Sequence, residues 1–297
     1  MLLDFRFCGN DVCVICVMKK KVVAIGMFDG VHLGHRKVLK TAVDYARNYN
    51  SETVVLTFDS IPKKQSGMLL TLAEKIRLIK SRGVKKIRVL PFNEIKNLIP
   101  ENFLKLYLKN CFCIVIGYNF RFGKKRRGTV KTIENFCKKT IIVKPVRYKS
   151  KTISSTLIKK ELLAGKIEKI NRLLGQNYTF EGKVIRGLGF GKKLGYPTAN
   201  LIVEKEKILP EGIFISRSEI GSKKYHSITY IGRRPTLGLS AITVEVYILG
   251  FAGRLYGKKI SVELLSKIRN DKKFLSVEKL VQQIKNDLEI TKSYFNR

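Results

Sequence analysis

The spacing of apolar residues divides the chain into two regions. From about residue 21 to residue 175, short β-rich runs alternate with segments whose apolar residues recur at helical spacing. The predicted strands are VVAIG, TVVLTF, KIRVLPF, CIVIG and TIIVKPV, and the predicted helices cover 36–48, 71–81, 101–109 and 130–138. A further helical stretch, STLIKKELLAGKIEKINRLLG, closes this region. Such alternation predicts a parallel sheet with helices on both faces.

After Tyr178 the pattern changes to short strand-like segments separated by glycine. They are EGKVIRGLGFGKKLGYPTANL, GIFISRSEI, YHSITYIG, ITVEVYILGF and ISVELL. Short strands at this spacing predict a small barrel. The end, SVEKLVQQIKNDLE, has helical spacing and starts with Ser and Glu in a pattern that predicts a capping box.

The domain organisation follows from this change of pattern. We expect an N-terminal extension over 1–17, an α/β domain over 18–178 and a barrel domain over 179–297. A length of 297 residues with 44% hydrophobic residues fits two globular domains. No apolar run approaches the ~20 residues that cross a bilayer, so we expect a soluble, cytoplasmic protein without a membrane partner.

The charge balance is strongly basic. Lys plus Arg number 59 against 23 Asp plus Glu, a net charge of +36, which attracts any polyanion. The lysines are scattered through every segment and form no single stripe or tail, which favours a compositional bias over a nucleic-acid site. Aromatic residues interleaved as platforms for single strands are not evident. We therefore expect no nucleic-acid partner.

Six cysteines are present, and their positions do not resemble a disulfide framework. Cys8, Cys13 and Cys16 fall near the N-terminus, where CVIC lacks the second pair that a zinc site needs. The same segment lacks a basic n-region and a clear cleavage site, so a secretory signal is not expected. Met18, followed by KKKVVAIG, is a more natural start, and our hypothesis is that 1–17 is an upstream mis-start, either non-native or disordered.

The stretch FDGVHLGH, residues 28–35, contains two of the three histidines. It joins a predicted strand to a predicted helix, where helix N-terminal amides favour phosphate and Gly30 and Gly34 allow close approach of a ligand. His32 and His35 add donors that can carry charge near neutral pH. The pair matches the HxGH signature of nucleotidyltransferases. The alternatives are two surface histidines that cap a helix and, with less support, a zinc site.

Two further loops have a composition that suits phosphate. GYNFRFGKKRRG, residues 117–128, follows a predicted strand and combines Asn119 with five basic residues and three glycines, although charge-rich loops are usually only solvated. ISSTLIKK, residues 153–160, places three hydroxyls before a helix. There Ser or Thr is most often an N-cap, but the same groups could hold phosphates, with Lys159 above them.

Taken together, these motifs resemble one family. FDGVHLGH, GYNFRFGK, ISSTLIKK, LGYPTANL, IGRRPT, VEVYIL and RNDKKF occur in the order and spacing of the bacterial bifunctional riboflavin kinase/FAD synthetases, from Val22 to Leu288. The resemblance implies a Rossmann-like FMN adenylyltransferase module followed by a six-stranded antiparallel β-barrel riboflavin kinase module with a C-terminal helix. The implied reactions are phosphorylation of riboflavin to FMN and adenylylation of FMN to FAD, with ATP as co-substrate and Mg²⁺ as cofactor.

The resemblance implies roles for particular residues of the first module. His32 and His35 are expected to bind ATP and to stabilise charge in the transition state. The other expected ATP contacts of this module are Gly26, Phe28, Asp29, Gly34, Asn119, Ser154, Ser155, Thr156 and Lys159.

In the kinase module the resemblance centres on LGYPTANL and VEVYIL. Thr198 and Asn200 supply the oxygen ligands that Mg²⁺ prefers, and Glu245 is the expected base that takes a proton from the riboflavin hydroxyl. Expected ATP contacts are Gly187, Gly189, Lys192, Gly195 and Thr198, and expected flavin contacts are Arg269 and Asn200. Without the resemblance, the PTAN sequence predicts a simple turn. Glu245 would then be a solvent-exposed residue of a strand, and Arg269 a surface charge at the end of a helix.

The chain departs from the family pattern at several positions. Ser60 and Ile61 stand where a Pro-His-Pro triplet is common, and Lys159 replaces an arginine that can grip phosphate with two bonds. Gly250, Ala252 and Arg254 replace an acidic stretch. The alternatives that remain are a monofunctional riboflavin kinase with a degenerate first module and a basic nucleic-acid-binding protein. The sequence does not determine the oligomeric state, and it is compatible with a monomer.

Overall fold

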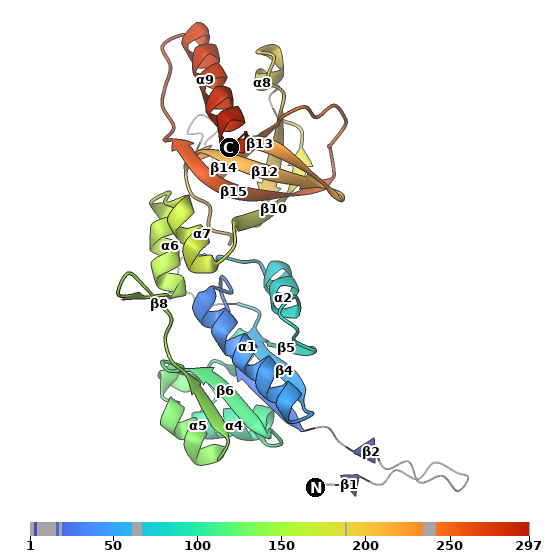
Figure 1. The fold of residues 1–297 in the computed structure, drawn as a ribbon, viewed down its shortest axis with the longest axis vertical. Coiled ribbons are helices and arrows are strands. Elements are labelled where there is room, and N and C mark those ends of the chain that lie inside the picture. Colours follow the sequence, from blue (N-terminus) through green and yellow to red (C-terminus); the bar gives the residue numbers. More distant parts are fainter. Residues whose placement is uncertain are drawn as a thin grey trace, which may run out of the picture. The chain divides into compact units, whose positions relative to one another are not determined.

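The computed structural model describes residues 3–4, 16–17, 20–60, 67–187, 189–233 and 242–296 (Figure 1). Contacts divide the chain into two compact units. Unit 1 comprises Met1–Gln65 and Leu72–Thr152, and unit 2 comprises Ser66–Thr71 and Ile153–Arg297. Apart from the two-residue strands β1 (Leu3–Asp4) and β2 (Cys16–Val17), the proposed N-terminal extension lies outside the described residues, as do Ile61 and the last residues of IGRRPT.

Unit 1 contains, within its described residues, a five-stranded parallel sheet in the order β5-β4-β3-β6-β7. The strands are the five that the sequence predicts: β3 (Lys21–Ile25), β4 (Glu52–Phe58), β5 (Lys86–Leu90), β6 (Cys113–Gly117) and β7 (Thr140–Val143). The helices are α1 (Leu33–Asn48), α2 (Leu72–Lys80), α3 (Phe92–Ile95), α4 (Pro100–Leu108) and α5 (Val130–Phe136), with a 3-10 turn η1 (Lys124–Arg126) and a hairpin of β8 (Arg147–Tyr148) and β9 (Lys151–Thr152).

Helices cover both faces of this sheet, as the alternation of strands and helices predicts. Val23 and Ile25 of β3 lie in one apolar core with Phe103 and Leu104 of α4. Their neighbours along β3 point to the opposite face and are equally buried, and α1 packs against β3, β4 and β6. The central strands are therefore apolar on both sides, which is typical of parallel sheets.

The closing helical stretch of the first region is two helices, not one. α6 (Ser155–Leu163) and α7 (Ile167–Leu174) are separated at Gly165, which has a φ of 71°. Both belong to unit 2. Asn171 of α7 donates to the carbonyl of Leu264 and accepts from the amide of Tyr178, both in the barrel, at 2.9 and 2.8 Å. The sequence-based domain boundary at 178 and this division of contacts differ, and the limits of the folding domains remain a prediction.

Unit 2 is built on a closed antiparallel barrel, in the order β10-β11-β14-β13-β12-β15 within the described residues. Its strands are β10 (Tyr178–Ile185), β11 (Thr198–Val203), β12 (Gly212–Ile220), β13 (Lys223–Arg233), β14 (Ile242–Ile248) and β15 (Lys259–Arg269). A short helix α8 (Phe190–Lys193) follows β10, and α9 (Val277–Phe295) ends the described chain. The predicted barrel and C-terminal helix are confirmed.

The start of α9 corrects one detail of the sequence analysis. Ser276 is the N-cap and accepts a hydrogen bond from the amide of Lys279 at 3.3 Å. A capping box needs Glu or Gln at that third helical position, but the glutamate is Glu278. The predicted cap is confirmed, and the predicted box is wrong.

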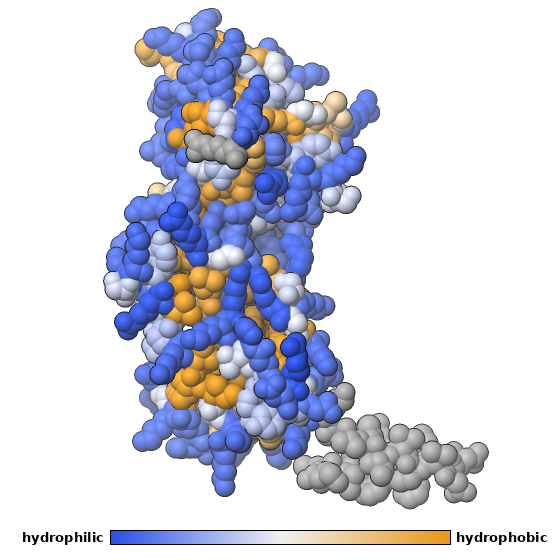
Figure 2. All heavy atoms as spheres, viewed as in Figure 1, coloured by the Kyte–Doolittle hydropathy of each residue, from blue (hydrophilic) through white to orange (hydrophobic). Residues whose placement is uncertain are grey.

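The surface of both units is largely hydrophilic. Figure 2 shows hydrophilic residues over most of the visible face, interrupted by separate apolar patches. Among the described helices, no stretch combines the length and the hydrophobicity that crossing a bilayer requires.

Candidate active sites

Two of the motifs follow neighbouring strands at one edge of the unit 1 sheet. FDGVHLGH leads from β3 into α1, and GYNFRFGKKRRG begins with Gly117, the last residue of β6. β3 and β6 pair in parallel, and the strand order changes direction between them. In open α/β sheets, ligands bind outside the carboxyl ends of the strands at this switch point. His32, His35 and Asn119 thus all lie at this edge.

His32 is the N-cap of α1. Its Nδ1 accepts a hydrogen bond from the amide of His35 at 3.3 Å, so the ring proton lies on Nε2. The helix starts at Leu33, earlier than the predicted residue 36, because this cap makes Leu33, Gly34 and His35 its first turn. His32 is 5% exposed, so the alternative of surface histidines is wrong although a cap is formed.

His35 stacks on His32, with 3.6 Å between ring centroids, and meets Phe28 edge-on at 5.3 Å. Its Nδ1 is buried and has no hydrogen-bond partner among the described residues. Burial lowers the pKa of His32 to about 4, and burial together with His32 and Lys75 lowers the pKa of His35 well below its usual value. Both pKa values therefore favour neutral rings at pH 7, whereas free imidazole can carry charge near that pH.

The loop between β3 and α1 has an unusual backbone. Phe28 and Val31 have φ values of 50° and 38°, and Gly30 has 88°. A β-branched residue rarely adopts such a conformation, so the surrounding contacts must hold it. Asp29 in the same loop is 6% exposed. Such strained, buried loops are frequent at ligand sites.

Sequence reasoning missed one charged residue at this edge. Lys75 of α2 is 4% exposed, and its Nζ donates to the carbonyls of Phe58 at 2.5 Å and Met27 at 3.4 Å. Burial lowers the pKa of Lys75 to about 8, against the opposite effect of the Asp29 and Asp59 carboxylates. The available signal was a lysine on the apolar face of the 71–81 pattern, between Leu72 and Ile79.

Asp59 and Ser60 occupy the end of β4, where the family triplet is absent. Asp59 Oδ1 accepts from the amide of Phe92 at 2.9 Å and from Ser60 Oγ at 3.0 Å. Burial raises the pKa of Asp59, but these hydrogen bonds and Lys75 outweigh it, so the pKa is lowered. A carboxylate is thus fixed beside the Lys75 ammonium group.

The ISST motif lies in unit 2. Ser154 is the N-cap of α6 and accepts from the amide of Leu157 at 3.2 Å, which confirms the capping interpretation. Ser155 and Thr156 form the first turn. Lys159 Nζ donates to the carbonyl of Gly67 at 2.8 Å, so a backbone oxygen holds the lysine.

The kinase candidates lie on the outer face of β11 and β14. Val244, Val246 and Ile248 are buried in the barrel while Glu245 alternates with them, as the strand pattern predicts. Thr198 Oγ1 donates to Glu245 Oε2 at 3.1 Å. Asn200 is the register partner of Glu245, and directly opposed residues share a face. Thr198, Asn200 and Glu245 therefore form one polar cluster.

The glycine-rich segment after β10 approaches this cluster. A Cβ atom at Gly187 would overlap the side chain of Asn200, so a larger residue there would have to displace Asn200. Gly189 and Gly195 have φ values of 70° and 85°, which favour glycine. Lys192 is exposed on α8. The glycine-rich segment therefore lies beside Thr198 and Asn200, the two expected metal ligands.

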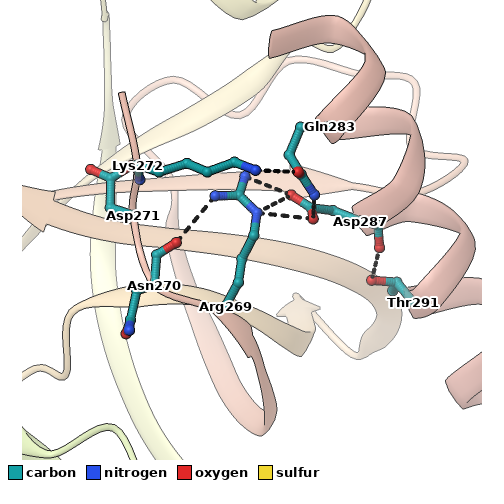
Figure 3. A network of polar contacts seen from close by, with 7 residues as sticks. All are labelled: Arg269, Asn270, Asp271, Lys272, Gln283, Asp287 and Thr291. Carbon is teal, nitrogen blue, oxygen red and sulfur yellow. Dashed lines mark hydrogen bonds and ion pairs between the residues drawn. The ribbon is translucent and has the colours of Figure 1, made fainter. Parts of the chain in front are cut away.

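Arg269 is the last residue of β15 and is held by α9 (Figure 3). Its Nε donates to both carboxylate oxygens of Asp287, at 3.0 and 3.1 Å, and its Nη2 donates to Oδ2 at 2.8 Å. Gln283 donates to Asp287 and accepts from Lys272. The interpretation of Arg269 as a surface charge at a helix end is wrong: it is a half-buried strand residue in an ion pair.

The remaining departures lie in an exposed loop. Gly250, Ala252 and Arg254 follow β14 and are exposed, and Gly250 has a φ of 66°. Among the residues described, no group of three His, Cys, Asp or Glu side chains is placed to hold a metal ion by itself.

The fold and these clusters define a class: a two-module chain with a nucleotide-binding α/β sheet and a barrel that carries a hydroxyl-carboxylate pair. Comparison with known proteins gives the family. Residues 16–157 match the FAD synthetase family model and residues 174–295 match the riboflavin kinase model. The chain belongs to the bifunctional riboflavin kinase/FMN adenylyltransferase family.

Curated relatives support this assignment over almost the whole chain. The protein of that name from Buchnera aphidicola subsp. Schizaphis graminum is 39% identical, covering 94% of this chain and 96% of the relative. The protein of that name from Bacillus subtilis is 33% identical, covering 93% of each. A crystal structure named as a macrolide-efflux protein from Streptococcus pneumoniae matches with a TM-score of 0.86 and 33% identity, covering 92% of this chain and 94% of the other.

Proposed function

We propose that the chain phosphorylates riboflavin to FMN in its barrel module and adenylylates FMN to FAD in its α/β module, using ATP in both steps. The observation that carries the proposal is the presence of both family matches in one chain, each over the module that contains the corresponding cluster. Relatives that cover more than nine-tenths of the chain have the bifunctional name.

In the kinase step, Glu245 is the proposed general base. It accepts the proton of the riboflavin 5′-hydroxyl as that oxygen attacks the γ-phosphorus of ATP, and ADP leaves. Thr198 donates to Glu245 Oε2, and this hydrogen bond orients the carboxylate. Arg269, fixed by Asp287, and Asn200 are the proposed flavin contacts.

The polar cluster fits a magnesium ion. Thr198 and Asn200 offer neutral oxygens on one face, next to a segment whose glycine backbone and Lys192 suit phosphate. Mg²⁺ typically binds with one or two protein oxygens and completes its shell with phosphates and water. When bound it supplies positive charge that neutralises the phosphates of ATP. Gly187, Gly189 and Gly195 allow the backbone to approach them.

In the adenylyl step, a phosphate oxygen of FMN attacks the α-phosphorus of ATP, and pyrophosphate leaves. The enzyme has to hold two anions in line. The N-terminus of α1 and the loop residues Gly26, Phe28, Asp29 and Gly34 are proposed to surround the triphosphate, with His32 and His35 as neutral hydrogen-bond donors. Asn119, Ser154, Ser155, Thr156 and Lys159 are the further proposed ATP contacts.

The proposal includes a monomer in the cytoplasm, where ATP is supplied, with riboflavin, FMN, FAD and ATP as its partners. It includes no nucleic-acid or membrane partner. Sedimentation of the purified protein at several concentrations tests the monomer.

One assay tests the main proposal. The purified chain is incubated with riboflavin, ATP and Mg²⁺, and the flavins are separated; FMN followed by FAD is the expected result. Accumulation of FMN with no FAD, also from supplied FMN, would instead support a monofunctional kinase, for which Ser60 and Lys159 are the motivating departures. Salt-sensitive binding to DNA with no flavin turnover would support the nucleic-acid alternative.

A further inference from the structure

Lys75 links two strand ends at the candidate adenylyltransferase site. Its Nζ donates to the carbonyl of Phe58, the last residue of β4, and to that of Met27, directly after β3. The Met27 carbonyl also accepts from Thr57 Oγ1 at 3.2 Å. The Lys75 side chain therefore holds the segment that leads into the loop in which Phe28 and Val31 have positive φ values.

A hydrophobic or neutral residue would satisfy the packing of α2 at lower cost, because a buried ammonium group loses its hydration. The titratable groups that interact with Lys75 are Asp29 in the loop after β3, Asp59 after β4 and His35 on α1. The two carboxylates compensate the ammonium charge. Burial is the main cause that lowers the pKa of His35, and the neighbouring His32 and Lys75 act in the same direction. Lys75 thus connects the backbone of the loop and the protonation state of His35.

We infer that Lys75 is a positioning residue for adenylyl transfer: through the Met27 and Phe58 carbonyls it fixes the FDGVHLGH loop and, with that loop, the place of His35. This inference rests on the proposed function of unit 1. The inference adds Lys75 of α2, which lies outside all the motifs identified in the sequence.

The test compares Lys75→Met and Lys75→Arg, with Lys80→Met as a matched control at the exposed end of the same helix. We expect Lys75→Met to lower kcat for FMN adenylylation about 10- to 100-fold, a size typical of misplaced reacting groups. Riboflavin phosphorylation in the same preparation should stay within about twofold, because its cluster lies in unit 2. Lys80→Met should change neither activity.

A histidine NMR titration supplies a readout that simple packing would not move and that needs no turnover. The chain has three histidines, and His35→Asn identifies one signal. We expect the His35 signal of Lys75→Met to titrate at higher pH than in the wild type, and that of Lys75→Arg to remain at the wild-type position. Identical titration in wild type and Lys75→Met would overturn the inference, as would unchanged kcat.

The two proposals fail in different ways. A wild-type protein that makes FMN but no FAD contradicts adenylylation by unit 1, while the NMR titration still decides whether Lys75 controls His35. A wild-type protein that makes FAD, with Lys75→Met equal to it in kcat and in titration, contradicts only the role of Lys75.

Discussion

At the scale of single residues, burial determines the chemistry of the histidine pair. The sequence indicates that His32 and His35 can carry charge near neutral pH, because free imidazole titrates there. In the folded chain, desolvation favours the neutral form of both rings. In the proposed site their contribution to anion binding is therefore that of neutral N–H donors at a helix N-terminus.

This burial predicts a pH dependence of stability. Because the pKa of His32 is about 4 in the folded state and about 6.5 when unfolded, the unfolded state binds more protons between these values, and stability falls as pH falls through this window. Between pH 6.5 and 5, the free energy of unfolding of His32→Asn, which can still cap the helix, should fall by about 1.5 kcal/mol less than that of the wild type, measured by urea denaturation. The wild type is unfolded in parallel as the reference; a fall in the stability of His32→Asn as large as that of the wild type would contradict the prediction.

Gly187 gives a second prediction at this scale. Its φ is not in the left-handed region, so alanine is strained only by its overlap with Asn200. We expect Gly187→Ala to displace Asn200 and to reduce riboflavin phosphorylation on the order of 10-fold, with adenylylation of supplied FMN unchanged. In Gly189→Ala the new Cβ strains the backbone but meets nothing within 4 Å. This variant separates the effect of backbone strain from the effect of contact with Asn200. Equal losses in both variants would count against a specific role of the Asn200 contact.

At the scale of elements, α9 is attached to the barrel by a buried ion pair. The side chains of Arg269 and Asp287 are 19% and 5% exposed, and Thr291 donates to the Asp287 carbonyl. At the other end of the helix, Phe295 stacks on His226 with 3.7 Å between ring centroids. The helix thus fixes the residue that we propose as a flavin contact.

Removing one partner of this pair should be costly, because it leaves the other charge buried and unpaired. We expect Asp287→Ala to lower the free energy of unfolding by about 3 kcal/mol, measured by urea denaturation, and to weaken riboflavin binding, measured by flavin fluorescence. Glu289→Ala, at an exposed position of the same helix, is the control. Unchanged stability in Asp287→Ala would show that the pair does not hold α9.

At the scale of the whole molecule, the histidine pair of unit 1 and the Glu245 cluster of unit 2 predict two separable activities. Glu245→Gln preserves the shape of the side chain but removes the base, so riboflavin phosphorylation should fall about 10²- to 10⁴-fold, with adenylylation within about twofold. His35→Asn should show the opposite. Both rates are measured on each variant, together with thermal unfolding; parallel losses of both activities in a folded variant would contradict independent sites.

The sequence by itself determined the strands and helices, the barrel and the places of the main motifs, because periodicity and glycine-rich turns are local signals. It placed FDGVHLGH at a strand-to-helix turn and Glu245 on the outer face of a strand, and both placements are confirmed. The sequence also identified the family, because seven motifs occur in it in the order typical of that family.

Only the tertiary structure decided what surrounds each charged group. That Lys75 is buried between two strand ends, that Arg269 pairs with Asp287, and that α6 and α7 belong with the barrel all depend on segments distant in sequence. The protonation of His32 and His35 depends on the same packing, because desolvation and neighbouring charges arise only when the chain is folded. The local sequence pattern does not predict these contacts, because they join residues that are distant along the chain.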